Sequence, residues 1–244
     1  MACKVMGIVN VTPDSFSDGG KFNTPEEAVR RAKNLIEEGA AIIDIGGEST
    51  RPGATPLRWD EEWARVEPVL RGLSPQLLGS VPISIDTYHP ETAERAIALG
   101  ASIVNCVYQD PIRDMAAICV KNNAELVIPC RIADLPLGSV PMDAGRLYLD
   151  PMIGFGTTRE EDLEILRSIF ELAKSGRVLV GASRKRIVKR LVGEKARGKD
   201  LAGNLAIAVW AAISGASVVR VHDVRETVQA LKVTAALTGA DEAN

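Results

Sequence analysis

Short runs of apolar, largely β-branched residues recur along the chain and alternate with longer stretches whose apolar residues have helical spacing. Most of the short runs are continuously apolar, which is typical of parallel strands that are buried on both faces. Eight runs predict strands in this way, at residues 4–9, 41–45, 82–85, 102–105, 126–128, 147–149, 178–180 and 217–221.

The stretches between these strands predict amphipathic helices. The helix over residues 24–38 has the clearest start, because Thr24-Pro25-Glu26-Glu27 is a capping box with proline at the first helical position. Further helices are predicted at residues 60–73, 90–99, 112–122, 159–175, 202–214 and 224–237. Only residues 131–145 separate the fifth strand from the sixth, and Pro136, Gly138 and Pro141 within them predict an irregular crossover.

The alternation of eight strands with helices predicts an α/β protein. It favours a closed (β/α)8 TIM barrel, although a doubly wound open sheet is compatible with much the same pattern. The length of 244 residues agrees with the roughly 250 residues of a typical barrel domain. We therefore expect one domain over residues 1–244, with the helix between strands five and six shortened or absent.

The composition of the chain indicates which partners the protein binds and which cellular compartment it occupies. Lys plus Arg number 29 against 32 Asp plus Glu, so there is no overall positive charge for nucleic acid, and any anion site must be local. Four cysteines without CxxC spacing suggest neither a zinc site nor a disulfide framework, and they suit a reducing compartment. The sequence contains no apolar run of 18 residues and begins without a signal-peptide pattern, so we expect a cytoplasmic protein without a membrane partner.

Polar residues gather directly after the predicted strands. In a barrel these positions share one mouth, where TIM-barrel enzymes carry their catalytic groups and often bind phosphate after strands seven and eight. Lys185, Arg220 and His222 occupy those last two strand ends. The other positions of this kind are Asn10, residues 44–51, Asp86, Asn105 and Asp150.

Each of these residues also has a purely structural interpretation. Asp44 and Asp223 are as compatible with a helix cap or a turn as with a functional role. Lys185 could belong to a solvated run of charge at a helix start, but a positive charge there opposes the helix dipole, and an anionic ligand would remove the conflict. His89 precedes Pro90 at a helix start and is interpreted as structural.

Local motifs resemble the dihydropteroate synthase family closely. Residues 6–20, Met-Gly-Ile-Val-Asn-Val-Thr-Pro-Asp-Ser-Phe-Ser-Asp-Gly-Gly, are similar to its first signature, and residues 44–54 are similar to its second. The other matching segments follow in order: 84–87, 150–151 with 154–156, 183–185 and 220–224. The resemblance implies a TIM-barrel transferase of folate biosynthesis, the target of sulfonamides, which joins 6-hydroxymethyl-7,8-dihydropterin pyrophosphate to para-aminobenzoate and releases pyrophosphate.

The resemblance also implies roles for individual residues. Asp86, Asp150 and Lys185 would be catalytic and, with Asn105, would hold the pterin. Arg220 would stack over the pterin ring and, with His222, would bind the pyrophosphate, while Asn10 would contact Mg²⁺. Thr50, Arg51, Pro52, Phe155 and Lys185 would form the para-aminobenzoate pocket. The family further suggests a homodimer formed through helices late in the chain.

Several positions depart from the family pattern. An Asn-Asp pair is replaced by Asn105-Cys106, Met-His-Met by residues 129–131 (Pro-Cys-Arg), a glycine by Met152 and a serine by Arg186. A carboxylate lost at Cys106 would weaken pterin affinity about tenfold or more. Pterin binding is therefore favoured over full synthase activity. A pterin-dependent methyltransferase of the same superfamily and a non-catalytic pterin-binding paralogue remain alternatives.

Overall fold

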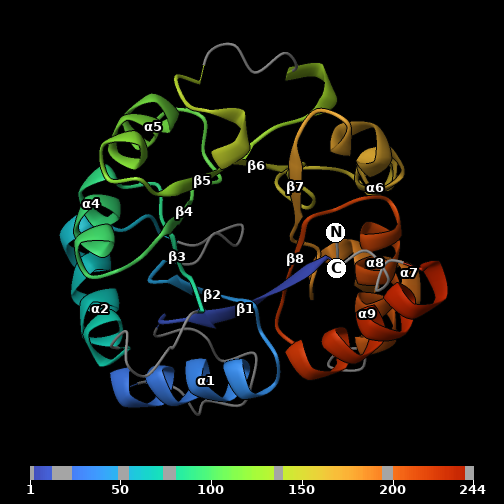
Figure 1. Cartoon of the computed structure of the whole chain (residues 1–244), viewed down its shortest axis with the longest axis horizontal. Coiled ribbons are helices and arrows are strands. Elements are labelled where there is room, and N and C mark those ends of the chain that lie inside the picture. The colour runs from blue at the N-terminus through green and yellow to red at the C-terminus, as the bar shows by residue number, and fades with distance from the viewer. Residues whose placement is uncertain are drawn as a thin grey trace.

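Eight parallel strands close into a barrel with helices packed around its outside (Figure 1). The computed structural model describes residues 3–12, 24–48, 55–73, 81–134, 140–193 and 200–239. Each strand pairs with its neighbours in chain order, and β1 (Lys4–Asn10) also pairs with β8 (Val218–Val221), which closes the ring. The predicted (β/α)8 barrel is therefore confirmed, and the open doubly wound sheet is excluded.

The predicted strands and helices lie where the sequence pattern puts them, with ends that differ by one or two residues. The other strands are β2 (Ile42–Gly46), β3 (Ile83–Asp86), β4 (Ile103–Asn105), β5 (Glu125–Pro129), β6 (Leu147–Asp150) and β7 (Arg177–Val180). The helices are α1 (Pro25–Glu37), α2 (Trp59–Gly72), α4 (Pro90–Ala98), α5 (Ile112–Lys121), α6 (Arg159–Ala173), α7 (Arg186–Val192), α8 (Leu201–Ile213) and α9 (Val224–Thr238). The pattern does not predict α7, because its seven residues make only two turns, too few for a helical period to show.

The connection between β5 and β6 contains no α-helix in its described residues, as predicted. Two short 3₁₀ helices, η2 (Ile132–Asp134) and η3 (Ala144–Arg146), stand there instead. Arg146 donates hydrogen bonds to the carbonyl oxygens of Cys119 and Ala124, so this short crossover is fixed against the end of α5.

The inside of the barrel changes abruptly from apolar to polar along its axis. The layer nearer the amino ends of the strands, the lower layer, is a separate apolar cluster. It is made of Met6, Ile42, Ile103, Val127, Tyr148, Leu179 and Val218. Side chains two residues apart on a strand point to the same face. Two residues beyond members of this layer come Asp44, Asn105, Asp150 and Arg220, which therefore point into the barrel near the carboxyl ends of the strands.

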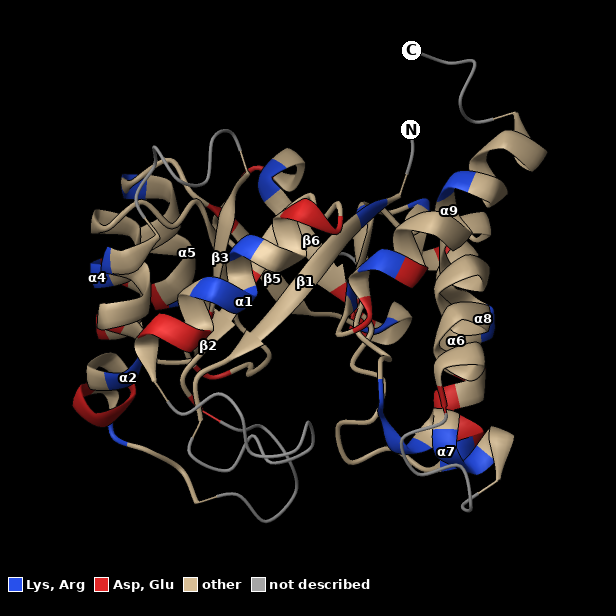
Figure 2. Ribbon diagram, turned by 90° about the horizontal axis from the view of Figure 1, so that it is seen from below, with Lys and Arg blue, Asp and Glu red and all other residues tan. Residues whose placement is uncertain are grey.

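The basic helix α7 lies at the same end of the barrel as these strand ends (Figure 2). Its first turn contains no acidic residue, and it follows Lys185 directly.

Among the described helices, none has the length and apolar character needed to cross a membrane.

Candidate active site

Arg220 joins two carboxylates inside the barrel mouth. Its Nε donates to Asp44 Oδ2 at 2.6 Å, and its Nη2 donates to Asp86 Oδ2 at 2.6 Å. The side-chain amide of Asn105 also donates to Asp44 Oδ2, at 3.3 Å. Residues from β2, β3, β4 and β8 thus meet in one network, as predicted for Asp86, Asn105 and Arg220.

Asp44 is the member of this network that the motif-based site does not include. It is fully buried within β2 and caps no helix, so the capping interpretation is wrong for this residue. The signal in the sequence was its spacing: Ile42 belongs to the lower layer inside the barrel, and a residue two positions later on the strand faces the same way. Asp223, by contrast, lies at the N-cap position of α9, and its carboxylate pairs with Arg184 at 2.8 Å.

Burial raises the pKa of two acids of this site, Asp86 and Asp150. Burial raises the pKa of Asp86 to about 7, and repulsion from Asp44 and Asp150 adds to this while Arg220 opposes it. Burial also raises the pKa of Asp150, against the nearby charge of Lys185 and a 2.7 Å hydrogen bond from the Met152 amide. A ligand that donates hydrogen bonds to these two carboxyl groups would therefore stabilise their ionised form.

Lys185 is turned into the site rather than solvated. Its Nζ donates to the carbonyl oxygen of Ile153 at 2.6 Å and lies 4.3 Å from the centre of the Phe155 ring. Burial lowers the pKa of Lys185 to about 8, although Asp150 raises it. The interpretation of this residue as part of a solvated charge run is wrong, and Phe155 is beside it as expected.

The glycine between those two contacts is required by the geometry. Gly154 has a φ of +77°, and a Cβ atom at this position would lie 2.9 Å from Lys185 Cδ. Its amide donates to Asp162 Oδ1 at 2.8 Å, which fixes the turn after β6. The Gly154-Phe155-Gly156 segment is therefore both a tight turn and the wall against which Lys185 packs.

The turns after β7 and β8 hold each other in place. Ser183 Oγ lies 3.1 Å from His222 Nδ1 and accepts a hydrogen bond from the His222 amide. Arg184 has a φ of +59°, and its amide donates to Asn204 Oδ1 at 2.9 Å. His222, Arg220 and Lys185 thus come from adjacent strand ends, as expected for a site that receives a phosphate group.

A second polar cluster lies beside the Arg220 network, at the turns that follow β2 and β3. Glu48 accepts a 2.8 Å hydrogen bond from the Tyr88 hydroxyl, and His89 Nε2 is 3.6 Å from its other oxygen. Thr87, next to Asp86, donates to the buried Glu62 at 2.6 Å, and burial raises the pKa of Glu62 to about 7. These contacts fix the turn after Asp86, which agrees with a structural role for His89.

Other predicted site residues are only partly placed. Asn10 ends β1 and pairs with Gly46 of β2, so its side chain lies at the mouth. Thr50, Arg51 and Pro52 fall outside the described residues, as does the stretch 13–20 of the first signature.

Two departures from the expected pattern do not touch the barrel interior. Cys106 and Cys130 are fully buried and belong to the outer apolar cluster, between the strands and the helices, while Asn105 lies on the inner face of β4. The expectation that Cys106 replaces a pterin-binding carboxylate is therefore wrong, because alternation along β4 turns its side chain outward. Arg186 is exposed at the start of α7, and Met152 has a left-handed φ of +66°.

Comparisons with known proteins agree with this geometry. A family model described as pterin binding enzyme matches residues 6–132 and 137–222. The chain is 38% identical to the dihydropteroate synthase of Bacillus subtilis, over 96% of this chain and 88% of that protein. It is 37% identical to the dihydropteroate synthase of Staphylococcus haemolyticus, over 91% of this chain and 90% of that protein.

Solved structures give the same result. Dihydropteroate synthase from Clostridium difficile, determined in the presence of pteroic acid, superposes with a TM-score of 0.87 at 38% identity, covering 97% of each chain. The Xanthomonas albilineans enzyme in complex with 7,8-dihydropteroate has a TM-score of 0.81 at 33% identity, over 97% of this chain and 94% of that one. The chain belongs to the pterin binding enzyme family and, within it, to the dihydropteroate synthases.

Proposed function

We propose that this chain condenses 6-hydroxymethyl-7,8-dihydropterin pyrophosphate with para-aminobenzoate to give 7,8-dihydropteroate and pyrophosphate. The observation that carries the proposal is the polar upper layer of the barrel, where Asp86, Asn105, Asp150 and Arg220 meet Lys185. This transferase reaction is a step of folate biosynthesis. The similarity to dihydropteroate synthases over nearly the whole chain supports it.

The pterin would bind to the buried carboxyls. An aminopyrimidinone edge offers adjacent N–H donors, and a carboxylate can accept two of them together. Asp150 is suited to this, because the Met152 amide donates to one of its two carboxylate oxygens, Oδ1. Asp86 and Asn105 would contact the pterin from β3 and β4, and Lys185 would contact it from the turn after β7.

The reaction exchanges one bond for another. The bond between the methylene carbon on pterin C6 and the pyrophosphate oxygen breaks, and its electron pair leaves with the oxygen. The amine nitrogen of para-aminobenzoate then forms the new C–N bond and loses a proton to solvent. Carboxylates at Asp86 and Asp150 stabilise the positive carbon, while Arg220 and His222 stabilise the departing anion.

Magnesium is the proposed cofactor. Mg²⁺ usually keeps several waters and binds through one or two protein oxygens together with substrate phosphates. Asn10 offers one amide oxygen at the mouth, which fits this kind of site. Bound there, Mg²⁺ would neutralise charge on the pyrophosphate.

The para-aminobenzoate pocket would lie beside Phe155 and Lys185. The ring of Phe155 faces the ammonium group of Lys185 at 4.3 Å, so the pair offers an apolar face and a positive charge to an aromatic carboxylate. By their place in the second family signature, Thr50, Arg51 and Pro52 would complete this pocket.

An assay of pyrophosphate release, with and without para-aminobenzoate and Mg²⁺, tests the proposal. We expect product only when all components are present. Lys185→Ala and Asp150→Ala should each reduce kcat/KM by roughly ten- to a hundredfold or more, since each removes at least one charged contact from a buried site, while leaving the unfolding transition in place. Failure to form an amine-dependent product would overturn the synthase assignment and leave a non-catalytic pterin-binding paralogue. Unchanged turnover in either variant would overturn the assignment of that residue.

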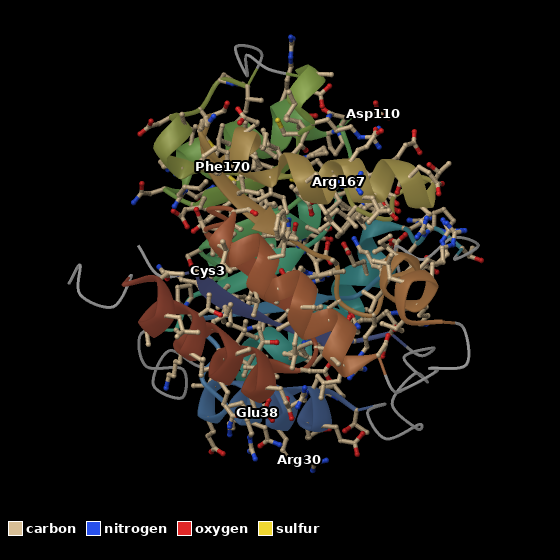
Figure 3. The ribbon with its side chains drawn as sticks, turned by 90° about the vertical axis from the view of Figure 1, so that its right-hand side faces the viewer. Cys3, Arg30, Glu38, Asp110, Arg167 and Phe170 are labelled. Atoms are coloured by element: carbon tan, nitrogen blue, oxygen red, sulfur yellow. The ribbon has the colours of Figure 1, made fainter. Side chains whose placement is uncertain are left out.

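We also propose a homodimer in the cytoplasm. Exposed large apolar residues gather on α6, α8 and α9, which lie side by side in Figure 3: Phe170, Trp210, Ile213, Val233 and Leu237. An apolar surface of this kind is typical of an interface. The four cysteines are free, which suits a reducing compartment. Sedimentation velocity should give the mass of a dimer, and a monomer at micromolar concentration would contradict the proposal.

A further inference from the structure

Asp44 has no role among the contacts proposed for the substrates, yet it is the most deeply placed charged group of the site. In the register of β2 and β3, Asp44 lies opposite Ser84, whereas Asp86 lies opposite Gly46. Asp44 is therefore two residues, roughly 6–7 Å, farther from the mouth than Asp86 along the strand direction. Its carboxylate is fully buried, while the side chains of Asp86 and Arg220 are 14% and 19% exposed.

The two carboxylates hold Arg220 through different nitrogen atoms. Nε donates to Asp44, which lies farther from the mouth, and Nη2 donates to Asp86, which lies nearer the mouth, each at 2.6 Å. A ligand that enters through the mouth can reach Asp86 and Arg220 but is separated from Asp44 by them. We infer that Asp44 is a positioning residue, which keeps Arg220 in place when Asp86 accepts hydrogen bonds from the pterin. This inference rests on the proposed function.

The stability cost of Asp44 supports a functional reason for its presence. Its Oδ1 atom, the Ser84 hydroxyl and Asn105 Oδ1 have no hydrogen-bond partner among the described residues, although all three are buried. A buried carboxylate with an unpartnered oxygen destabilises the fold relative to an apolar side chain of similar size. Packing alone therefore does not explain a carboxylate here, whereas a fixed counter-ion for Arg220 does.

Removal of the Asp44 charge should act on Asp86 through Arg220. The charged groups that surround Asp86 are Arg220, Asp44, Asp150 and Lys185, with Glu62 behind it. In Asp44→Asn, Arg220 has Asp86 as its one remaining carboxylate in this network, and the repulsion between Asp44 and Asp86 is lost. Both changes favour ionised Asp86 tightly paired with Arg220, so Asp86 becomes less available to the pterin.

The test compares Asp44→Asn with a matched control at the other end of the barrel. Glu125→Gln breaks the partly buried pair between Arg177 and Glu125, also 2.6 Å long, on the side away from the mouth. We expect Asp44→Asn to raise the KM for the pterin pyrophosphate roughly tenfold or more and to move the acidic limb of the kcat/KM profile to lower pH. The KM for para-aminobenzoate should stay within about twofold of wild type, because the altered bond is on the pterin side. Glu125→Gln should alter only the unfolding temperature.

The outcomes separate this inference from the function on which it rests. Wild-type turnover is measured first, and if it is absent the proposed function fails, while calorimetric binding of the pterin pyrophosphate with Mg²⁺ still reports the role of Asp44. An Asp44→Asn protein with wild-type pterin affinity and pH profile overturns the inference, as does an equal effect of Glu125→Gln. If Asp44→Asn does not fold, Asp44→Glu keeps the charge but displaces Arg220. It should weaken pterin binding with the acidic limb unmoved, and wild-type affinity in this variant would also overturn the inference.

Discussion

Two glycines of one turn allow the role of Lys185 to be tested separately from backbone strain. Gly154 and Gly156 have φ values of +77° and +72°, so alanine at either position is strained by about 1–2 kcal/mol. They differ in surroundings. A Cβ atom at Gly154 would lie 2.9 Å from Lys185 Cδ, whereas nothing lies within 4 Å of a Cβ atom at Gly156.

Gly154→Ala and Gly156→Ala should therefore lose similar stability and differ in activity. A loss of 1–2 kcal/mol corresponds to a fall of about 2–8 °C in Tm for a protein of this size. Only Gly154→Ala displaces Lys185 from the Ile153 carbonyl and from the Phe155 ring. Loss of one charge-assisted contact to the substrates lowers kcat/KM by roughly ten- to a hundredfold.

Urea unfolding and steady-state kinetics on both variants check this reasoning. Gly156→Ala is expected to keep kcat/KM within about threefold of wild type at a temperature where both variants are folded. The argument fails if Gly156→Ala loses as much activity as Gly154→Ala, since strain in the turn would then be the cause. It also fails if Gly154→Ala keeps wild-type kinetics.

Three further predictions follow from the buried and strained positions. Because burial raises the pKa of Glu62 from 4.5 to about 7, the stability that this group contributes is fully present below pH 4.5 and is lost as the pH rises through 7. The free energy of unfolding of the wild type should thus fall by about 2–3 kcal/mol across that range relative to Glu62→Gln, and parallel pH curves would contradict this. Met152→Gly should raise the free energy of unfolding by about 0.5–1 kcal/mol, because it removes a methionine from the left-handed region. Asn123, at φ +55°, is the control, since asparagine tolerates this region better. An equal gain from Asn123→Gly would show that strain at the methionine is not the cause. Cys106→Asp should destabilise the fold by about 3 kcal/mol or more and leave the pterin KM unchanged, and tighter pterin binding in this variant would show that the side chain faces the pocket.

The strands, most helices and the polar strand ends could be predicted from the sequence because each depends on local spacing. Closure of the barrel could not, since the pairing of β1 with β8 joins segments more than 200 positions apart that an open sheet would place equally well. The direction of Cys106 was mispredicted because the family motif gives a residue type without its face, whereas alternation from Ile103 gives the face. Asp44 was missed for another reason: its spacing from Ile42 gives its face, but its importance lies in a bond to Arg220, 176 positions away, which no local pattern contains.

The Asp44–Arg220 bond also makes assembly of the site depend on closure of the barrel. It joins residues 176 positions apart, from the second strand and the eighth. A nascent chain therefore has no site until the final strand has emerged and docked beside β1. Recovery of activity during refolding should follow the slowest global phase, because the groups that would bind the pterin have no common location before the ring of strands is complete.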